Sequence, residues 1–291
     1  MRVLVTGGAG FIGSHLCARF LDQGHEVLCL DNLSTGRKAN IEPLLGHNGF
    51  SFEQSDVAAV DYSPLPVCDL VCHFASLASP PRYRSDPFGT MRANALATWH
   101  LLSWCKKTKA RFLFAGTSEV YGDPVVTPQP ESYFGNVNSY GPRSCYDESK
   151  RFGETLVFEF NGLGVDTRVA RIFNTFGPGM DPSDGRVIPN FIMSALLNRP
   201  LTVYGTGQQT RSLLYVSDLV DALMSLATRE DLSGTVVNLG GTVELTVSAW
   251  RERIATKWGR GASDQLLLNL YLSLLQDRTE PIDRLRQPVV E

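Results

Sequence analysis

Tyr146 and Lys150 are the residues whose types and spacing best suit proton transfer. They stand four positions apart, so on a helix their side chains lie on one face. A lysine ammonium beside a phenol lowers the pKa of the phenol and makes it a usable base near neutral pH. An isolated pair of this kind is commonly an aromatic ring packed under a solvated lysine. The pair is therefore informative only together with Thr117-Ser118-Glu119 upstream and a glycine-rich opening of the chain.

The opening of the chain has the pattern of a strand, a tight turn and a helix. Residues 2–6 are a short apolar run, and Gly7, Gly10 and Gly13 follow it directly. Gly7 can take the turn conformation, Gly10 lets the backbone approach a pyrophosphate, and Gly13 permits close packing of helix against strand. The phosphates would then lie at the helix N-terminus. An ordinary βα turn is the competing interpretation.

Asp31 ends a second predicted strand, about 20 residues beyond the glycines. A carboxylate at this place accepts hydrogen bonds from the adenosine ribose, and its charge disfavours a 2′-phosphate. We therefore expect NAD rather than NADP, although Arg37 and Lys38 could neutralise such a phosphate. Together the motifs predict a dinucleotide enzyme that oxidises a hydroxyl.

The rest of the chain alternates strand and helix patterns, which predicts an α/β fold with a doubly wound (Rossmann) parallel sheet covered on both faces. Further strands are expected at 50–52, 70–75, 111–116, 165–172 and 236–239, and helices at 86–106, 142–160, 187–197 and 217–227. Asp86-Pro87 is a good helix cap followed by a first-turn proline.

Composition argues against several classes of protein. The formal net charge is −3 with no basic run, so no nucleic-acid partner is expected. No apolar stretch reaches membrane-spanning length, residues 266–275 being the nearest, and a first strand at Arg2 leaves no room for a signal peptide. Without a Cys-x-x-Cys pair, the cysteines are interpreted as reduced core residues of a cytosolic protein, not as metal ligands. They are Cys17, Cys29, Cys68, Cys72, Cys105 and Cys145.

Seven segments up to about Gly241 resemble the extended short-chain dehydrogenases/reductases that act on nucleotide sugars, and among these the UDP-glucuronate decarboxylases. The segments are TGGAGFIGSH from Thr6, HFASLASPPRY from His73, GTSEVYGDP from Gly116, NSYGPRSCYDESKR from Asn138, ARIFNTFGPGM from Ala170, DGRVIPNFI from Asp184 and LTVYGTGQQTRSLLYVSDL from Leu201. The Ser-Pro-Pro and Pro-Arg-Ser-Cys-Tyr-Asp-Glu stretches point to the subfamily.

The resemblance implies catalytic roles for five residues. It places Thr117 and Tyr146 at the 4-hydroxyl of the sugar, Lys150 on the nicotinamide ribose and Glu119 next to the sugar ring. At Ser118, 4,6-dehydratases carry an aspartate that protonates the departing 6-hydroxyl. A serine cannot supply that acid. Ser118 therefore argues against a dehydratase more strongly than against a 4-epimerase, since the 4-epimerases also often have small residues at this position.

The resemblance also implies binding residues. Expected cofactor contacts are Gly7, Gly10, Phe11, Ile12, Gly13, Asp31, Asn32, Asp56, Val57, Ala75, Asn94, Tyr146 and Lys150. Expected substrate contacts are Tyr83, Glu119, Arg171, Asn174, Arg186, Tyr204 and Arg211. An ion pair is an equally good interpretation for any single arginine, and a structural amide is one for Asn94. His73 is interpreted as a packed strand residue rather than a catalyst.

The implied organisation is an NAD-binding domain over residues 1–170 and a smaller nucleotide-sugar lobe over 171–291, with the chain crossing between them. After Gly241 the pattern of the family stops and the lobe looks shortened. An amphipathic helix is expected at 248–258, followed by the apolar run 266–275 and a polar ending.

The implied activity is that of a lyase, the NAD-dependent decarboxylation of UDP-glucuronate to UDP-xylose through a 4-keto intermediate with the cofactor recycled. A cytoplasmic homodimer, paired through the two long helices that include Tyr146 and its neighbour, is expected. A 4-epimerase, an oxidoreductase that releases a 4-keto product and a non-catalytic NAD-binding protein stay open. The sequence leaves undecided whether Glu119 or Arg211 handles the acid step.

Overall fold

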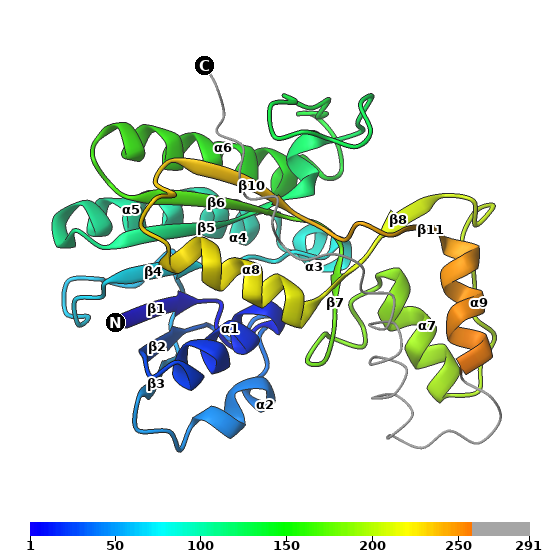
Figure 1. The fold of residues 1–291 in the computed structure, drawn as a ribbon, viewed down its shortest axis with the longest axis horizontal. Helices are drawn as coiled ribbons and strands as arrows, with labels where there is room; N and C mark the ends of the chain where they lie inside the picture. The colour runs from blue at the N-terminus through cyan, green and yellow to red at the C-terminus, as the bar shows by residue number, and fades with distance from the viewer. Residues whose placement is uncertain (258–291) are drawn as a thin grey trace.

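The computed structural model describes residues 1–257. Seven parallel strands form one sheet in the order β10-β6-β5-β4-β1-β2-β3, and helices cover both of its faces (Figure 1). The strand order reverses beside β1, which confirms the predicted doubly wound fold. The strands are β1 Arg2–Thr6, β2 Glu26–Leu30, β3 Phe50–Glu53, β4 Leu70–His73, β5 Arg111–Thr117, β6 Thr167–Ile172 and β10 Thr235–Leu239.

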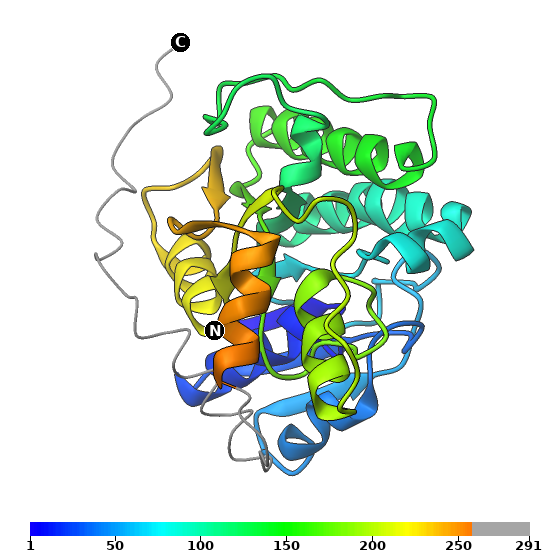
Figure 2. The ribbon, with the colours of Figure 1, turned by 90° about the vertical axis from the view of Figure 1, so that its right-hand side faces the viewer.

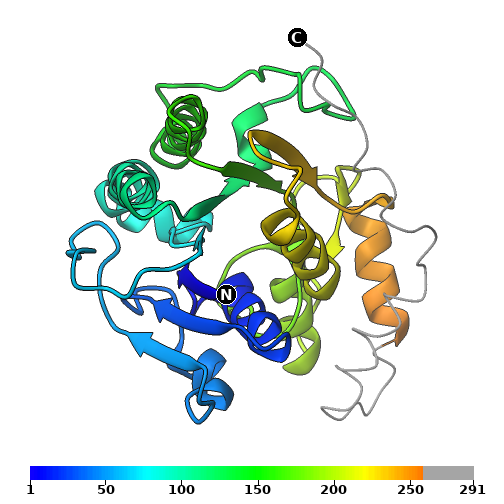
Figure 3. The same cartoon turned by 60° about the vertical axis from the view of Figure 1, so that its left-hand side comes forward.

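Alternate residues of the central strand supply two separate cores. Val3 and Val5 of β1 pack in the cluster that includes α1 (Phe11–Asp22) and α8 (Val216–Thr228). Leu4 belongs to the cluster under α5 (Ala97–Thr108) and α6 (Ser144–Gly162). Successive side chains of a strand point to opposite faces, so each face receives its own pair of helices (Figure 3).

The helix expected over 86–106 is confirmed as a helical path but is not uniform. Asp86 caps α4 (Pro87–Met91) by accepting a hydrogen bond from the Gly89 amide at 2.8 Å. A π-helical segment, η2 (Arg92–Leu96), then connects α4 to α5. Asn94 lies in this wider turn and donates from Nδ2 to Ser149 Oγ of α6 at 3.0 Å. A π-turn inside a helix is frequently found at functional sites.

Two helices and short strands from the later part of the described chain lie beyond the carboxyl end of the sheet (Figure 1). Helices α7 (Val187–Leu196) and α9 (Val247–Lys257) lie side by side (Figure 2). An antiparallel pair, β8 (Thr210–Ser212) with β11 (Glu244–Thr246), accompanies them, and β7 (Thr175–Phe176) pairs with β9 (Leu214–Tyr215). The expected helix over 248–258 thus forms as α9, whereas the run 266–275 and the polar ending lie outside the described residues.

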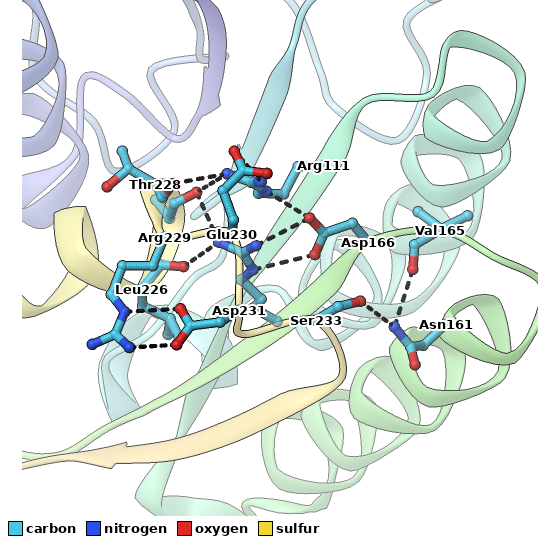
Figure 4. Close-up of polar contacts among 12 residues, drawn as sticks. Arg111, Asn161, Val165, Asp166, Leu226, Thr228, Arg229, Glu230, Asp231 and Ser233 are labelled. Atoms are coloured by element: carbon cyan, nitrogen blue, oxygen red, sulfur yellow. Dashed lines mark hydrogen bonds and ion pairs between the residues drawn. The ribbon is translucent and has the colours of Figure 1, made fainter. Parts of the chain in front are cut away.

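The chain returns to the sheet through α8 and β10. Arg168 and Arg111 hold the end of α8, and Figure 4 shows Arg111 with Asp166 and the end of that helix. Arg168 of β6 donates to the carbonyl of Leu226 at 2.6 Å, and Arg111 of β5 donates to that of Ala227 at 2.9 Å. Asp166 accepts hydrogen bonds from both guanidinium groups. Cations at a helix C-terminus complement its dipole, so α8 is held to the amino edge of the sheet. The proposed division at residue 170 stays a prediction.

Short helices complete the described chain: α2 Lys38–Ile41, η1 Glu42–Leu44, α3 Pro80–Ser85 and η3 Ser118–Tyr121. Five of the six cysteines are buried and Cys145 is half-buried, and all are free thiols. Within residues 1–257 no helix is long and apolar enough to cross a membrane. The same part of the chain holds no cluster of three or more His, Cys, Asp or Glu side chains suited to a metal ion.

Candidate active site

The glycine-rich turn after β1 has the geometry that its glycines suggested. Gly7 has a φ of 71°, and a Cβ atom there would lie 2.6 Å from the amide nitrogen of Ala75. A Cβ atom on Gly13 would lie 2.1 Å from the carbonyl oxygen of Gly7. Only glycine fits at these two positions, because one needs a left-handed backbone and the other a close helix–strand contact. Gly10 is the N-cap residue of α1.

Asp31 follows β2 and its side chain binds the same glycine-rich turn. Its carboxylate accepts hydrogen bonds from the amides of Ala9 at 3.0 Å and Leu33 at 2.8 Å. Burial raises the pKa of Asp31, and these backbone hydrogen bonds oppose the rise. The carboxylate is therefore fixed in orientation beside the glycine turn.

One cavity extends from the glycine turn past Asp31 to the loop after β4. Seven of the expected cofactor residues line it: Gly7, Gly10, Asp31, Asn32, Asp56, Val57 and Ala75. The hydroxyl of Ser76, also in the lining, is buried without a hydrogen-bond partner in the described chain. A buried polar atom of this kind needs a partner. A glycine cradle, a fixed carboxylate and an unpartnered hydroxyl fit a dinucleotide.

Tyr146 and Lys150 lie together on one face of α6, as the spacing predicted. Both are buried, and the Lys150 ammonium nitrogen lies 6.0 Å from the centroid of the Tyr146 ring. Lys150 donates to the carbonyl oxygen of Ala115 in β5 at 2.8 Å. Burial lowers the pKa of Lys150 to about 7, with Glu154 opposing the shift. The lysine is thus poised to exchange its proton near neutral pH.

The pKa of Tyr146 moves in the direction opposite to the one expected from the sequence. Burial raises it, while a hydrogen bond with Thr117 and the charge of Arg186 lower it. Desolvation of a phenolate wins because Tyr146 is buried, at 6% exposure. One of its neighbours is Tyr83, which stacks on it at 5.2 Å between centroids. Activation of the phenol therefore depends on Thr117 and nearby cations.

The Thr-Ser-Glu group lies at the carboxyl end of β5. Thr117 caps η3 by accepting a hydrogen bond from the Glu119 amide at 3.3 Å. Ser118 is half-buried in η3. Glu119 forms an ion pair with Arg143. Thr117 and Tyr146 are thereby brought together from two elements.

Two of the expected substrate residues adjoin Tyr146. Tyr83 on α3 is buried and its hydroxyl has no partner within the described residues. Arg186, the residue before α7, pairs with Asp184 through both carboxylate oxygens. Asn174 is exposed, and its carbonyl oxygen accepts a hydrogen bond from Leu214 at 2.9 Å.

The other three have different surroundings. Arg171 donates to both oxygens of Glu154 and to the Tyr121 hydroxyl at 2.8 Å, so the ion-pair alternative describes its contacts. Its guanidinium is part of the framework between β6 and α6. Tyr204 and Arg211 are exposed, and Arg211 donates to the carbonyl of Thr210. Their roles toward substrate stay predictions.

His73 occupies the place in β4 that was expected of a packed strand residue. It is buried, with Nδ1 at 2.7 Å from Thr6 Oγ1 and Nε2 at 3.1 Å from the Ala93 carbonyl oxygen. Burial lowers its pKa to about 3, so the ring is neutral at physiological pH. Both ring nitrogens are engaged inside the protein.

Sequence reasoning missed two residues that adjoin the site, Arg143 and Asp147. Asp147 Oδ2 lies 3.7 Å from Arg143 Nε, and Oδ1 is buried without a partner in the described chain. Burial raises the pKa of Asp147 to about 6. Their i, i+4 spacing, in the same stretch as Tyr146 and Lys150, was the available signal.

Residues 3–240 match the model of the NAD dependent epimerase/dehydratase family. The chain belongs to this family. NAD is accordingly its cofactor, and the cavity described above has the residues to hold it. The resemblance of the motifs to nucleotide-sugar enzymes is confirmed at the level of the family.

Several relatives share almost half of the residues. The chain is 47% identical over 267 residues to UDP-glucuronic acid decarboxylase 1 of Xenopus tropicalis. This match covers 91% of this chain and 62% of that protein. It is 46% identical over 257 residues to UDP-glucuronic acid decarboxylase 5 of Arabidopsis thaliana, covering 87% and 74%. The chain thus spans less than two thirds of the length of the first relative.

The fold is also found in a solved structure of a related enzyme. UDP-glucuronic acid 4-epimerase from Bacillus cereus, in complex with UDP-glucuronic acid and NAD, matches with a TM-score of 0.81 and 28% identity. The match covers 90% of this chain and 85% of the epimerase. Architecture alone therefore does not separate a decarboxylase from an epimerase.

Proposed function

We propose that the protein is a carboxy-lyase that converts UDP-glucuronate to UDP-xylose, with NAD recycled within the site. The observation that carries this proposal is the identity of 46% and 47% to two UDP-glucuronic acid decarboxylases, against 28% to the 4-epimerase. Ser118 supports it, because a serine cannot act as the acid that a 4,6-dehydratase needs at this position.

The proposed chemistry begins at carbon 4 of the sugar. Thr117 and Tyr146 hold the 4-hydroxyl, and Tyr146 accepts its proton. Bound NAD supplies the acceptor for the hydride of carbon 4 and later its donor. Lys150, with a pKa near 7, passes a proton to or from the phenol and holds the nicotinamide ribose. The same two hydroxyl groups stabilise the oxyanion of the ketone by hydrogen bonding.

Oxidation at carbon 4 makes the sugar a β-keto acid, so carbon dioxide leaves readily from carbon 5. Carbon 5 is then protonated, and Glu119 is the residue best placed to manage this step because it adjoins Thr117 at the end of β5. Return of the hydride to carbon 4 gives the pentose. We assign Arg186 rather than Arg171 to the substrate, since Arg171 is fully engaged by Glu154 and Tyr121.

A 4-epimerase is the second candidate, because the solved UDP-glucuronic acid 4-epimerase shares this architecture. Incubation of the protein with UDP-glucuronate and NMR identification of the product separates the two. We expect UDP-xylose and carbon dioxide with no net NADH. UDP-galacturonate without loss of carbon dioxide would establish the epimerase, and accumulating NADH would establish an oxidase that releases a keto product.

A homodimer is proposed through the layer formed by α4, α5 and α6. Large apolar side chains are exposed along it: Phe88, Met91, Leu96, Trp99 and Phe152. The first four recur at helical spacing on one side of α4, η2 and α5, and an exposed apolar stripe of this kind favours a protein partner. A second copy of the chain would cover it by pairing the same helices.

A reducing compartment such as the cytoplasm is proposed on the basis of the free thiols. Five of the six cysteines are buried as free thiols in the core. Cysteines used as small apolar core residues are typical of intracellular proteins.

A further inference from the structure

Arg143 occupies the position between two carboxylates at the start of α6. It is the N-cap residue of the helix, three positions before Tyr146. Its guanidinium pairs with Glu119 of η3, and its Nε lies 3.7 Å from Oδ2 of Asp147. One cation therefore connects the end of β5 to the first turn of α6, the two elements that carry the proposed reacting groups.

The two carboxylates differ in their exposure. The side chain of Asp147 is 9% exposed and that of Glu119 is 35% exposed. Asp147 lies on the protein side, where burial raises its pKa, Arg143 opposes the rise and Glu148 adds to it. Glu119 is the one of the two that reaches solvent. The buried carboxylate of Asp147 therefore orients Arg143, and Arg143 in turn holds the more exposed carboxylate of Glu119.

Arg143 has no other evident task at this place. Its side chain makes no capping hydrogen bond to α6, and among the described residues its ion pairs are those with Glu119 and Asp147. A planar guanidinium suits such a bridge because its donors point in fixed directions. A lysine would keep the charge but not the two-sided geometry.

The charge of Arg143 also matters for an acidic substrate. Glu119 and Asp147 would both repel a sugar that carries its own carboxylate. Arg143 offsets one of these negative charges. Burial raises the pKa of the Tyr83 phenol, and Arg143 lies close enough for its charge to oppose that rise. The bridge therefore makes a site that contains Glu119 compatible with a uronic acid.

We propose that Arg143 is a positioning residue that holds Glu119 in place beside the sugar, with Asp147 as the buried carboxylate that orients Arg143. The role assigned to Glu119 rests on the proposed decarboxylase function; the bridge itself does not. The two parts are tested separately.

The first test is a double-mutant cycle on turnover of UDP-glucuronate by the full chain. Arg143→Met should lower kcat by about 10²-fold, the order expected for a displaced reacting group, with a smaller change in KM. In a Glu119→Gln background the same substitution should change kcat little, because the group that it positions is already lost. Arg143→Lys should recover part of kcat, and Asp147→Asn should lower kcat in the wild type but not in Arg143→Met.

Three outcomes would overturn the proposal. The first is an equal loss of kcat from Arg143→Met in both backgrounds. The second is a raised KM with unchanged kcat, which would assign Arg143 to direct substrate binding. The third is full activity of Arg143→Met. Arg229→Met is the matched control, since Arg229 is a comparably exposed arginine paired with Asp231, and its turnover should equal that of the wild type.

The second test needs no substrate. The thermal midpoints of Arg143→Met, Glu119→Gln and the double variant should be non-additive, because the pair interacts directly. If the wild type does not decarboxylate UDP-glucuronate, the proposed function is wrong. The thermal midpoints still show whether Arg143 and Glu119 interact. Additive midpoints would overturn the bridge whatever the activity.

Discussion

Burial shifts the pKa values of the reacting residues more than the spacing of those residues along the helix does. Tyr146 and Lys150 stand on one face of α6, yet burial raises the pKa of the phenol and lowers that of the ammonium to about 7. Both shifts favour the neutral forms. The pair is thus set to exchange a proton with a bound hydroxyl rather than to rest as a charged phenolate and ammonium.

Removal of the phenol oxygen tests the proposed base. Tyr146→Phe keeps the ring that stacks on Tyr83 and removes the group that accepts the proton. Turnover of UDP-glucuronate should fall by about 10²–10⁴-fold, while NAD measured after denaturation should stay at the wild-type level. Tyr140→Phe is the control, because Tyr140 is 95% exposed in the loop before α6. Near-normal turnover of Tyr146→Phe would exclude the assignment.

The depressed pKa of Lys150 predicts a pH-dependent stability. Between its folded pKa of about 7 and its ordinary value of 10.5, the unfolded chain binds the extra proton, so stability rises with pH across this window. Below the window both states are protonated and the buried charge destabilises the fold by a constant amount. Lys150→Met lacks this pH-dependent contribution, because its buried thioether carries no charge that burial could destabilise.

Urea unfolding of nucleotide-free protein at several pH values measures the effect. The free energy of unfolding of Lys150→Met minus that of the wild type should be largest at pH 6 and should shrink as the pH rises toward 10. A difference that does not change with pH would show that Lys150 keeps its ordinary pKa in the fold.

Element positions at the two edges of the sheet are fixed by different means. At the carboxyl edge, close contacts of Gly7 and Gly13 set the turn between β1 and α1. At the amino edge, Arg111 and Arg168 bind the last carbonyl groups of α8 and share Asp166. The candidate site lies at the carboxyl edge of the sheet, and the arginine contacts that hold α8 lie at the amino edge.

Arg168 makes the amino edge testable. It is fully buried, and Arg168→Met would remove the guanidinium donor of the Leu226 carbonyl group and leave Asp166 and the Ala227 carbonyl group with Arg111 alone. We expect the free energy of unfolding to fall by about 3 kcal/mol, the order measured when one partner of a buried pair is removed. Chemical denaturation is the measurement, and Arg229→Met, at an exposed pair nearby, should behave as the wild type. An unchanged midpoint for Arg168→Met would show that α8 is held by apolar packing alone.

The molecule as a whole presents the α4–α5–α6 layer on the face away from α1 and α8 (Figure 3). Trp99 is 52% exposed there although it contacts Phe160 edge-on. A soluble monomer rarely exposes several large side chains in one stripe. The same layer carries Tyr146 and Lys150 on its inner side, so a partner on the outer side would stiffen the helix that bears the site.

A charge placed in the stripe tests the proposed dimer. Trp99→Glu and Phe152→Glu should each convert the protein from dimer to monomer in analytical ultracentrifugation, because a glutamate loses its hydration on association. Val67→Glu is the control, since Val67 is 61% exposed just before β4 and outside this layer. A monomeric wild type, or glutamate variants that remain dimeric, would contradict this interface.

The sequence by itself determined what local spacing encodes. The glycine turn, the strand and helix pattern and the shared face of Tyr146 and Lys150 each depend on residues close together in the chain, whose backbone geometry follows from their types. These features were predicted correctly, and they fixed the doubly wound sheet and the family. The helical path over 86–106 was also predicted, although its π-helical turn at Asn94 was not. The expected lowering of the Tyr146 pKa was wrong, because burial raises it.

Only the tertiary structure decided contacts between distant segments and the energetics of burial. Arg171 meets Tyr121, 50 positions away, and so lies in the framework. Arg143 meets Glu119 across the loop between β5 and α6. The direction of the Tyr146 pKa shift follows from enclosure by α3 and β5, which no spacing within α6 reveals. Desolvation depends on every atom that excludes water, and that quantity exists only once the chain is folded.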